Sequence, residues 1–188
     1  MNNEKNERFI DKIVEILKEK FVNFNTIFQI NEYRNQFTLL LNDKNLILNL
    51  LQELKENPET NFDVLIDITA IDWARNAKRF ELVYFLYSFE NKFRLRIKIP
   101  IEENNCICET AEKIYPSANW YEREVWDMYG IKFENHSDFR RFYMPEDFYN
   151  KETGEQYHPL RKDFPLMGIP DSLPLPHYPE KYKNEVGF

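Results

Sequence analysis

The chain has 188 residues, of which 43% are hydrophobic, and its 25 Lys and Arg against 32 Asp and Glu give a net charge of −7. The negative charge argues against a protein whose main task is to bind nucleic-acid phosphates, and the hydrophobic content excludes general disorder. All four glycines lie beyond position 129. The first two-thirds therefore lack the glycine-rich loops of dinucleotide-binding and P-loop proteins.

Membrane and metal classes are also constrained by the sequence. No apolar run reaches the roughly 18 residues of a membrane-spanning helix, and the first residues do not resemble a signal peptide, so we expect a soluble or membrane-peripheral chain. Cys106 and Cys108 are too close for the usual paired metal motif, and the histidines at 136, 158 and 177 are far apart. We therefore expect no iron-sulfur or zinc centre built from this chain alone.

The first third of the chain predicts a helix, two strands and a second helix. Apolar residues recur at helical spacing over residues 7–21, and two short β-prone runs follow at 26–30 and 36–41. The polar residues 31–35 between these runs predict a hairpin connection. A second helix is predicted over residues 45–54, with Asn42-Asp43 as its cap.

The middle third predicts three strands. β-branched and aromatic residues dominate 63–71, 79–89 and 92–101, and Glu90-Asn91 joins the last two as a hairpin. In the last strand, apolar residues alternate with Arg94, Arg96 and Lys98, so one face carries three cations in a row. This row is either a solvated outer face or a docking surface for an acidic partner.

Helical spacing then returns over residues 109–115, is broken at Pro116, and resumes over 118–129 with Gly130 as the C-cap. This order of elements predicts an α+β fold, with a mostly antiparallel sheet and helices on one face. Residues 145–188 contain most of the prolines, which exclude helix and central strand. We therefore divide the chain into an α+β domain at 1–144 and an extended proline-rich C-terminal segment at 145–188.

The predicted helix at 118–129 is dense in charged residues. Glu124 and Asp127 are three residues apart and repel each other unless a cation lies nearby. Acid/base catalysis and metal binding are two uses for such carboxylates, but the sequence shows neither a pocket nor histidines at ligand spacing. A third use is a buried ion network, within the chain or across an interface. Five cations could complete it: Arg123, Arg140, Arg141, Arg161 and Lys162.

The block at residues 158–165 reads His-Pro-Leu-Arg-Lys-Asp-Phe-Pro, so two prolines frame Arg161, Lys162 and Asp163. Extended segments of this kind present charges and aromatic anchors to a groove on another protein, and prolines lower the entropy cost of doing so. The alternative is a segment that folds back on its own domain.

Three ordered motifs resemble one protein family. They are WYEREVWDMYGIKF at 120–133, HSDFRR at 136–141 and PLRKDFP at 159–165, and the similarity extends upstream through residues 62–98. Together they resemble the 30 kDa subunit family of respiratory complex I, which is the C-type subunit of NADH-quinone oxidoreductases.

The resemblance implies a non-catalytic peripheral-arm subunit of a proton-translocating NADH-quinone oxidoreductase that braces the D-type subunit, which helps to form the quinone site. FMN, the iron-sulfur clusters, NADH and quinone would be bound by partner subunits of the assembly, and no nucleic acid is involved. The chain would lie on the cytoplasmic side of the inner membrane and reach the membrane only through the complex.

For the site residues, the resemblance and the charge pattern together imply a partner interface or structural ion network, with no catalytic or metal-binding residue. Its expected members are the charged motif residues Glu122, Arg123, Glu124, Asp127, His136, Arg140, Arg141, Arg161, Lys162 and Asp163. Two alternatives stay open. One is the equivalent subunit of a membrane-bound hydrogenase or ferredoxin-linked complex, and the other is a stand-alone hydrolase that uses Glu122, Glu124 and Asp127.

Overall fold

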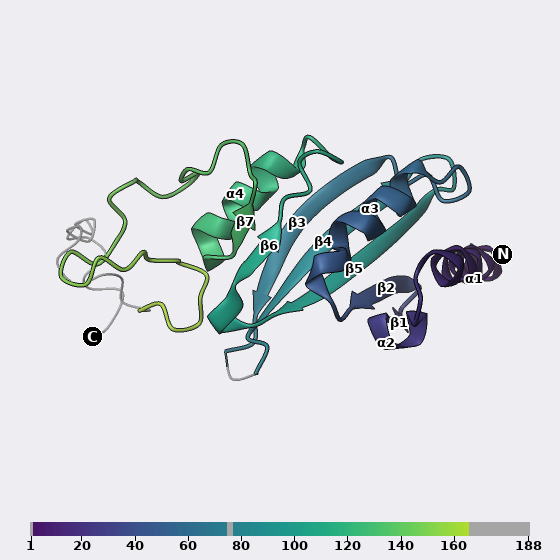
Figure 1. The fold of residues 1–188 in the computed structure, drawn as a ribbon, viewed down its shortest axis with the longest axis horizontal. Helices are drawn as coiled ribbons and strands as arrows, with labels where there is room; N and C mark the ends of the chain where they lie inside the picture. The colour runs from purple at the N-terminus through teal and green to yellow at the C-terminus, as the bar shows by residue number, and fades with distance from the viewer. Residues whose placement is uncertain (1, 75–76, 166–188) are drawn as a thin grey trace, which may run out of the picture.

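A computed structural model describes residues 2–74 and 77–165 and shows a five-stranded sheet in the order β1-β2-β5-β4-β3 (Figure 1). All neighbouring strands pair antiparallel except β2 and β5, which are parallel. The predicted α+β class with a mostly antiparallel sheet is therefore confirmed. The strands are β1 (Phe28–Tyr33), β2 (Gln36–Leu41), β3 (Val64–Asp72), β4 (Phe80–Ser88) and β5 (Phe93–Ile101).

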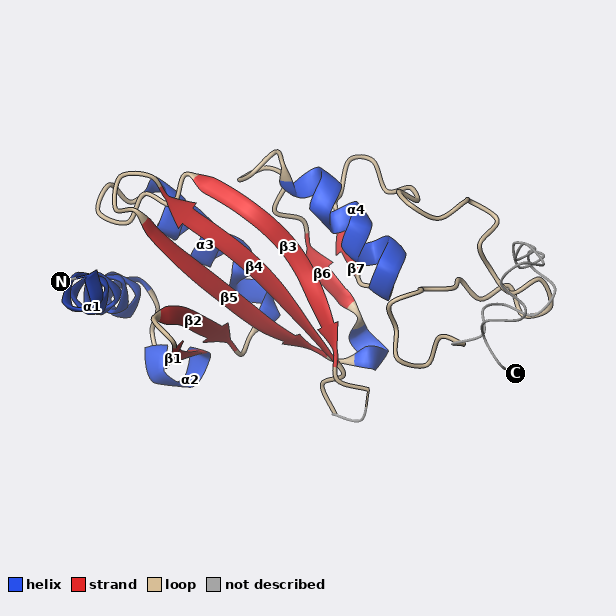
Figure 2. Cartoon of the chain, turned by 180° about the vertical axis from the view of Figure 1, so that it is seen from behind, coloured by secondary structure: helices blue, strands red, loops and turns tan. Residues whose placement is uncertain are grey.

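The core lies between one face of this sheet and helix α3 (Ile47–Glu56), which crosses that face in Figure 1. Strand residues alternate between two faces, so the apolar residues of β5 from Phe93 to Ile101 all point the same way and are buried. On the side of α3 that faces the sheet, four residues at helical spacing are buried, namely Ile47, Leu50, Leu51 and Leu54. Figure 2 shows the opposite face of the sheet, where no helix of the described chain covers β4 and β5.

Helix α1 (Asn2–Lys20) extends the core beyond the sheet. Its apolar stripe buries Ile10, Ile13 and Leu17, and the ring of Phe9 packs edge-on against Phe93 at 4.9 Å. The helix predicted over residues 7–21 is thus confirmed, with an earlier start.

The first hairpin differs from its prediction. Residues 24–27 form a short helix, α2 (Phe24–Ile27), and β1 continues through Tyr33 rather than ending at residue 30. The predicted hairpin is therefore confirmed, but the bounds of its connection, 31–35, are wrong, because the turn consists of Arg34 and Asn35 alone. Both residues have positive φ, 51° and 60°, as a two-residue turn between twisted strands requires.

The helix predicted over residues 109–115 is also wrong. A short strand, β6 (Ile107–Glu109), pairs in parallel with β7 (Lys132–Glu134). The chain then makes a single turn, in which the backbone N–H groups of Ile114 and Tyr115 donate to the carbonyl of Ala111. Pro116 follows at once and cannot continue a helix, so one turn is all that forms.

Helix α4 (Ala118–Tyr129) packs beside β3 at the edge of the sheet, as Figure 1 shows. Gly130 ends it in the left-handed conformation at φ 79°, and its N–H donates to the carbonyl of Trp126. The predicted helix and its C-cap are both confirmed.

After β7, residues 135–165 contain no helix or strand, and one isolated bridge joins Tyr149 to Gln156. The remainder of the predicted C-terminal segment, residues 166–188, lies outside the described residues. Within the described part of the chain, no helix has the length and apolar character needed to cross a membrane.

Candidate interface on helix α4 and the C-terminal segment

Helix α4 buries three charged side chains. Glu122 and Asp127 are fully buried, and Arg123 is 5% exposed. A buried charge without partners costs several kcal/mol, so each of these groups must be paired or hydrogen-bonded. The hydrogen-bond partners of these three side chains show which segments of the chain are attached to α4.

Asp127 holds the loop that follows β7. One carboxylate oxygen, Oδ1, accepts a hydrogen bond from Arg141 Nη1 at 2.6 Å. The other accepts the backbone N–H groups of Phe142, Tyr143 and Met144 at 3.2, 2.7 and 2.8 Å. Burial alone would raise the pKa of Asp127, but these four bonds outweigh it and lower the pKa below its ordinary value.

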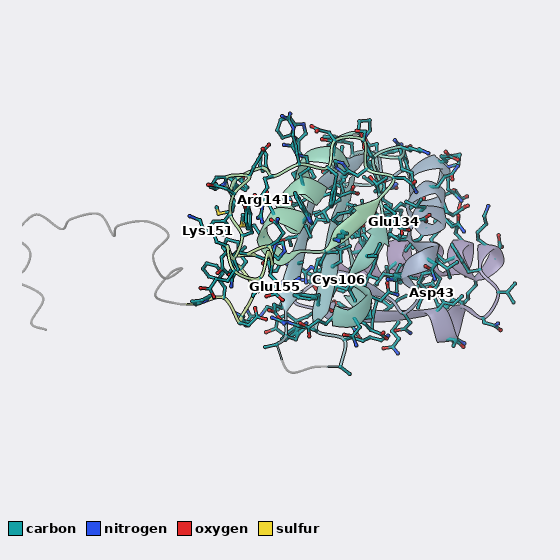
Figure 3. The ribbon with its side chains drawn as sticks, turned by 60° about the vertical axis from the view of Figure 1, so that its left-hand side comes forward. Asp43, Cys106, Glu134, Arg141, Lys151 and Glu155 are labelled. Atoms are coloured by element: carbon teal, nitrogen blue, oxygen red, sulfur yellow. The ribbon has the colours of Figure 1, made fainter. Side chains whose placement is uncertain are left out.

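Arg141 is the centre of that loop, and Figure 3 shows it on the segment that runs beside α4. Besides Asp127, its guanidinium donates to the carbonyl oxygens of Tyr157 and Phe148 at 3.1 and 3.0 Å, and to the side chain of Gln156. Its charge also lies 5.6 Å from the ring centre of Trp126. One arginine therefore joins α4 to two later points of the chain, at Phe148 and at 156–157.

Arg123 fixes the beginning of the same loop. Its Nε and Nη2 donate to the backbone carbonyls of Arg140 and Arg141 at 3.3 and 3.2 Å, and its Nη1 lies 3.4 Å from Asp138 Oδ2. The guanidinium contacts the rings of both Trp120 and Phe142, at 5.2 and 5.4 Å from their centres. Arg140 itself is exposed, and its Nε donates to Asp138 at 3.0 Å.

Glu122 points to the opposite side of α4, toward β6. Its carboxylate accepts the hydroxyl of Thr110 at 2.6 Å and the backbone N–H of Ala111 at 2.7 Å. Burial raises the pKa of Glu122 to about 7 despite these bonds. His136 Nε2 lies 4.0 Å away and bonds to the carbonyl of Asn119, while its Nδ1 accepts the N–H of Asp138. His136 therefore joins the end of β7 to the start of α4.

Glu124 stands apart from these contacts. No hydrogen bond or ion pair joins its side chain to any residue in the described ranges. Partial burial, and secondarily the charge of Asp67 on β3, raise its pKa. Of these two carboxylates, Asp127 alone is paired with a cation in the described ranges, and the charge of Arg141 offsets the repulsion expected between Glu124 and Asp127.

The block at 158–165 folds against its own domain as far as the structure describes it. His158 Nδ1 bonds to the carbonyl of Asp127 at 3.0 Å, and Arg161 Nε donates to the carbonyl of Tyr129 at 2.6 Å. Arg161 also lies over the ring of Phe80 at 5.1 Å. Gly130 makes this approach possible, because a Cβ there would lie 2.7 Å from His158 Nε2 and closer still to Arg161 Nη2.

The end of this block reaches a second ion cluster at the edge of the sheet. Arg79 makes a two-pronged contact with Asp72, at 3.0 and 2.8 Å, and its Nη1 lies 2.8 Å from Asp163 Oδ2. The backbone N–H of Lys162, whose side chain is exposed, donates to Asp72 at 2.8 Å. Burial raises the pKa of Asp72, but the bonds from Arg79 and Lys162 outweigh it and hold that pKa at about 2.

Sequence reasoning did not name Asp72 and Arg79 as members of the site. Asp72 ends β3 and Arg79 directly precedes β4, and Asp72 is paired in register with Phe80. Two opposite charges at the joined ends of neighbouring strands were a usable signal, because strand pairing brings such ends together.

Above this framework, large aromatic side chains reach the surface. Trp120, Tyr143 and Phe139 are 56%, 58% and 37% exposed. The ring of Phe142 connects two of them, with centres 5.3 Å from Trp120 and 4.4 Å from Tyr143. Trp126 contacts Phe139 at 4.5 Å. We refer to Trp120, Phe139, Phe142 and Tyr143 as the aromatic surface. Exposed aromatic side chains in a group are typical of a protein interface.

The fold and this site define a class of protein. It is an α+β domain in which buried ion pairs and hydrogen bonds fix the chain after β7 as far as residue 163, and which presents aromatic side chains to solvent. Among residues 2–74 and 77–165, no three His, Cys, Asp or Glu side chains gather where they could hold a metal ion.

The family follows from comparison with known proteins. The family model described as the respiratory-chain NADH dehydrogenase 30 Kd subunit matches residues 40–170. The C-type subunit of the NADH-quinone oxidoreductase of Geotalea uraniireducens (strain Rf4) is 40% identical over 158 residues, which is 84% of this chain and 88% of that protein. One of the C-type subunits from Rhizobium meliloti (strain 1021) is 43% identical over 147 residues, 74% of this chain and 76% of the relative. The chain belongs to the complex I 30 kDa subunit family, which confirms the resemblance found in its motifs.

Two solved structures share the fold. A trypsin-resistant fragment (1-134) of Nqo5 aligns with a TM-score of 0.57 at 23% identity, covering 69% of this chain and 98% of the fragment. A chain of the membrane-bound sulfane sulfur reductase, an archaeal respiratory membrane complex, aligns with a TM-score of 0.63 at 26% identity, covering 94% of this chain and 90% of that one.

Proposed function

We propose that this chain is a peripheral-arm subunit of a proton-translocating NADH-quinone oxidoreductase, without a cofactor of its own, and that it braces the D-type subunit at the quinone site. The chain's relatives are C-type subunits of NADH-quinone oxidoreductases. The observation that carries the proposal is the aromatic surface, since Trp120 and Tyr143 are more than half exposed on a rigid base of buried ion pairs. A partner that covers these rings would remove large apolar areas from water.

In this proposal the electron carriers, FMN and iron-sulfur clusters, and the sites for NADH and quinone lie in the partner subunits. The chain sits on the cytoplasmic side of the inner membrane and contacts the membrane through the complex. Its buried charges then have a structural role, because they hold the aromatic surface in one conformation and so lower the entropy cost of association.

A second candidate is the equivalent subunit of a membrane-bound hydrogenase or ferredoxin-linked complex. The observation that favours it is the similarity to a chain of an archaeal respiratory membrane complex over 94% of this chain. The stand-alone hydrolase is disfavoured, because Glu122 and Asp127 are fully buried and hydrogen-bonded to protein groups while Glu124 lies apart.

The test is purification of the assembly through an affinity tag on this chain, in the organism that makes it, followed by mass spectrometry and an NADH:quinone reductase assay. We expect co-purification of the quinone-site subunit and the NADH-binding flavoprotein subunits, with activity in the assembly and none in the isolated chain. Recovery with a nickel-iron hydrogenase subunit would select the second candidate. NADH oxidation by the isolated chain would contradict both.

A further inference from the structure

The face of the sheet opposite α3 presents a row of cations beside a row of aromatic side chains. Strand pairing places Tyr87 opposite Arg94 and Phe85 opposite Arg96. These residues alternate with the buried ones along β4 and β5, so they all point to the open face that Figure 2 shows. We refer to Phe85, Tyr87, Arg94 and Arg96 as the open-face row.

Lys98, the third cation on this face, is already neutralised. Its Nζ lies 2.9 Å from Glu81 Oε2 on the neighbouring strand. Arg94 and Arg96, by contrast, form no ion pair with any side chain of residues 6–74 or 77–165, the ones that the structure describes. Arg96 donates to a neutral acceptor, the side-chain oxygen of Gln36, at 2.7 Å.

The two arginines are held in a defined orientation by the rings beside them. The guanidinium carbon of Arg94 lies 5.8 Å from the ring centre of Tyr87, and that of Arg96 lies 5.2 Å from that of Phe85. An arginine stacked on a ring keeps its N–H groups available at its edge, where they match the two oxygens of a carboxylate.

A groove runs along this row. It has a volume of about 640 Å³, and its lining includes the cations Lys92, Arg94 and Arg96 together with Gln36, Ile66, Phe85 and Tyr87. Ile66 is the extra residue at an irregularity in the pairing of β3 with β4, and it is 40% exposed. The groove thus combines apolar walls with two arginines that have no carboxylate partner among the described residues.

We propose that this groove binds an acidic segment of another subunit of the assembly, with an apolar side chain between the groove walls and carboxylates against Arg94 and Arg96. The inference rests on the proposed function, because it requires an assembly. Charge complementarity supports a protein occupant. With Lys92, which also lines the groove, the cations there number three, and in a chain of net charge −7 three are too few for a nucleic acid or an anionic membrane, which require larger basic clusters. Arginine with aromatic neighbours is instead the composition of a protein interface.

The test places the photo-crosslinking residue p-benzoylphenylalanine at Tyr87, and in a second variant at Phe89, in the complex purified through this chain. Phe89 lies just beyond β4, is 63% exposed and contacts the Tyr87 ring at 5.1 Å. We expect both probes to crosslink to one segment of another subunit that is rich in Asp and Glu.

Charge reversal gives the specific control. Arg94→Glu with Arg96→Glu should reduce the crosslink at least about fivefold, since like charges replace attraction. Lys113→Glu with Lys151→Glu, at exposed positions elsewhere, changes the net charge equally and should leave the yield unchanged.

Four results would overturn the inference: no crosslink from either probe, a crosslink to lipid, a crosslink to a second copy of this chain, or a yield unaffected by the reversal. Each leaves the proposed function intact as long as the chain still co-purifies with the complex. Loss of the wild-type chain from the complex would instead refute the proposed function.

Discussion

Asp127 and Arg141, fourteen residues apart, meet at 2.6 Å with side chains that are 0% and 5% exposed. Asp127 also receives three consecutive backbone N–H groups from the loop that Arg141 belongs to. The pair therefore shapes a loop as well as neutralising two charges, and the aromatic surface depends on that loop for Phe142 and Tyr143.

Breaking this pair should be costly. Asp127→Asn leaves Arg141 buried without its carboxylate, and we expect a loss of about 3 kcal/mol in the free energy of unfolding. Urea denaturation of the single variants and of Asp127→Asn with Arg141→Met would measure the coupling. Arg140→Ala, at the exposed neighbour, is the control and should change stability by less than about 1 kcal/mol. Equal losses of unfolding free energy from Arg140→Ala and Asp127→Asn would show that the buried pair contributes no more to stability than an exposed side chain.

Two glycines in the described part of the chain have positive φ and offer a matched comparison. A Cβ at Gly154, φ +73°, meets nothing within 4 Å, whereas a Cβ at Gly130, φ +79°, would overlap His158 and Arg161. Gly154→Ala should cost about 1 kcal/mol from backbone strain alone. Gly130→Ala should cost about 1–3 kcal/mol more, because it displaces the segment at 158–161. Faster hydrogen exchange in that segment of the Gly130 variant alone would identify the cause, and equal stability of the two variants would contradict it.

Glu122 should make stability depend on pH. Its pKa is raised from 4.5 to about 7, so the folded state favours the protonated form. Its stabilising contribution is complete below pH 4.5 and is lost as pH rises through 7, by about 3 kcal/mol in total.

Glu122→Gln removes that dependence while keeping both hydrogen bonds, since the Thr110 hydroxyl can accept as well as donate. His158 has the opposite effect on the pH dependence of stability. Burial lowers its pKa to about 4, so its contribution to stability grows as pH rises. The quantity to measure is therefore the difference in unfolding free energy between wild type and Glu122→Gln from pH 4 to 8. We expect the variant to gain relative to wild type as pH rises, and a constant difference would argue against a titrating Glu122.

The aromatic surface should matter for association rather than for folding. Trp120→Ala and Tyr143→Ala remove mostly exposed rings, so we expect little change in melting temperature. Recovery of the quinone-site subunit with the tagged chain should fall roughly tenfold, the effect of losing an interface anchor worth about 1–2 kcal/mol. Tyr33→Ala removes a ring that is 70% exposed at the end of β1 and should not affect recovery. Full recovery of the quinone-site subunit with both Trp120→Ala and Tyr143→Ala would show that the interface lies on another part of the chain.

Local patterns predicted much of the fold. Alternation in β5 and helical spacing in α4 depend on residues a few positions apart, and these elements formed where the sequence placed them. Residues 109–115 show the limit of this reasoning. Their apolar spacing suited a helix, but pairing of β6 with the distant β7 and the stop at Pro116 prevailed.

The site divides in the same way. The sequence indicated that α4 needs cations and left five candidates open. The structure selected Arg141 for Asp127, assigned Arg123 to Asp138 and the backbone of the loop, and left Glu124 unpaired among the described residues. Spacing along a helix reports which side chains share a face, but it does not report which distant segment packs against that face.

By itself, the sequence determined the family, the α+β class and the location of the charged helix, because ordered motifs and short-range periodicity are properties of the chain alone. The tertiary structure decided which charges meet and that residues 158–163 lie on their own domain, through contacts of His158 and Arg161 with the backbone of α4 and of Asp163 with Arg79. The physical reason is burial. Once Asp127 and Asp72 leave water, only partners that fold within hydrogen-bond distance can stabilise their charges.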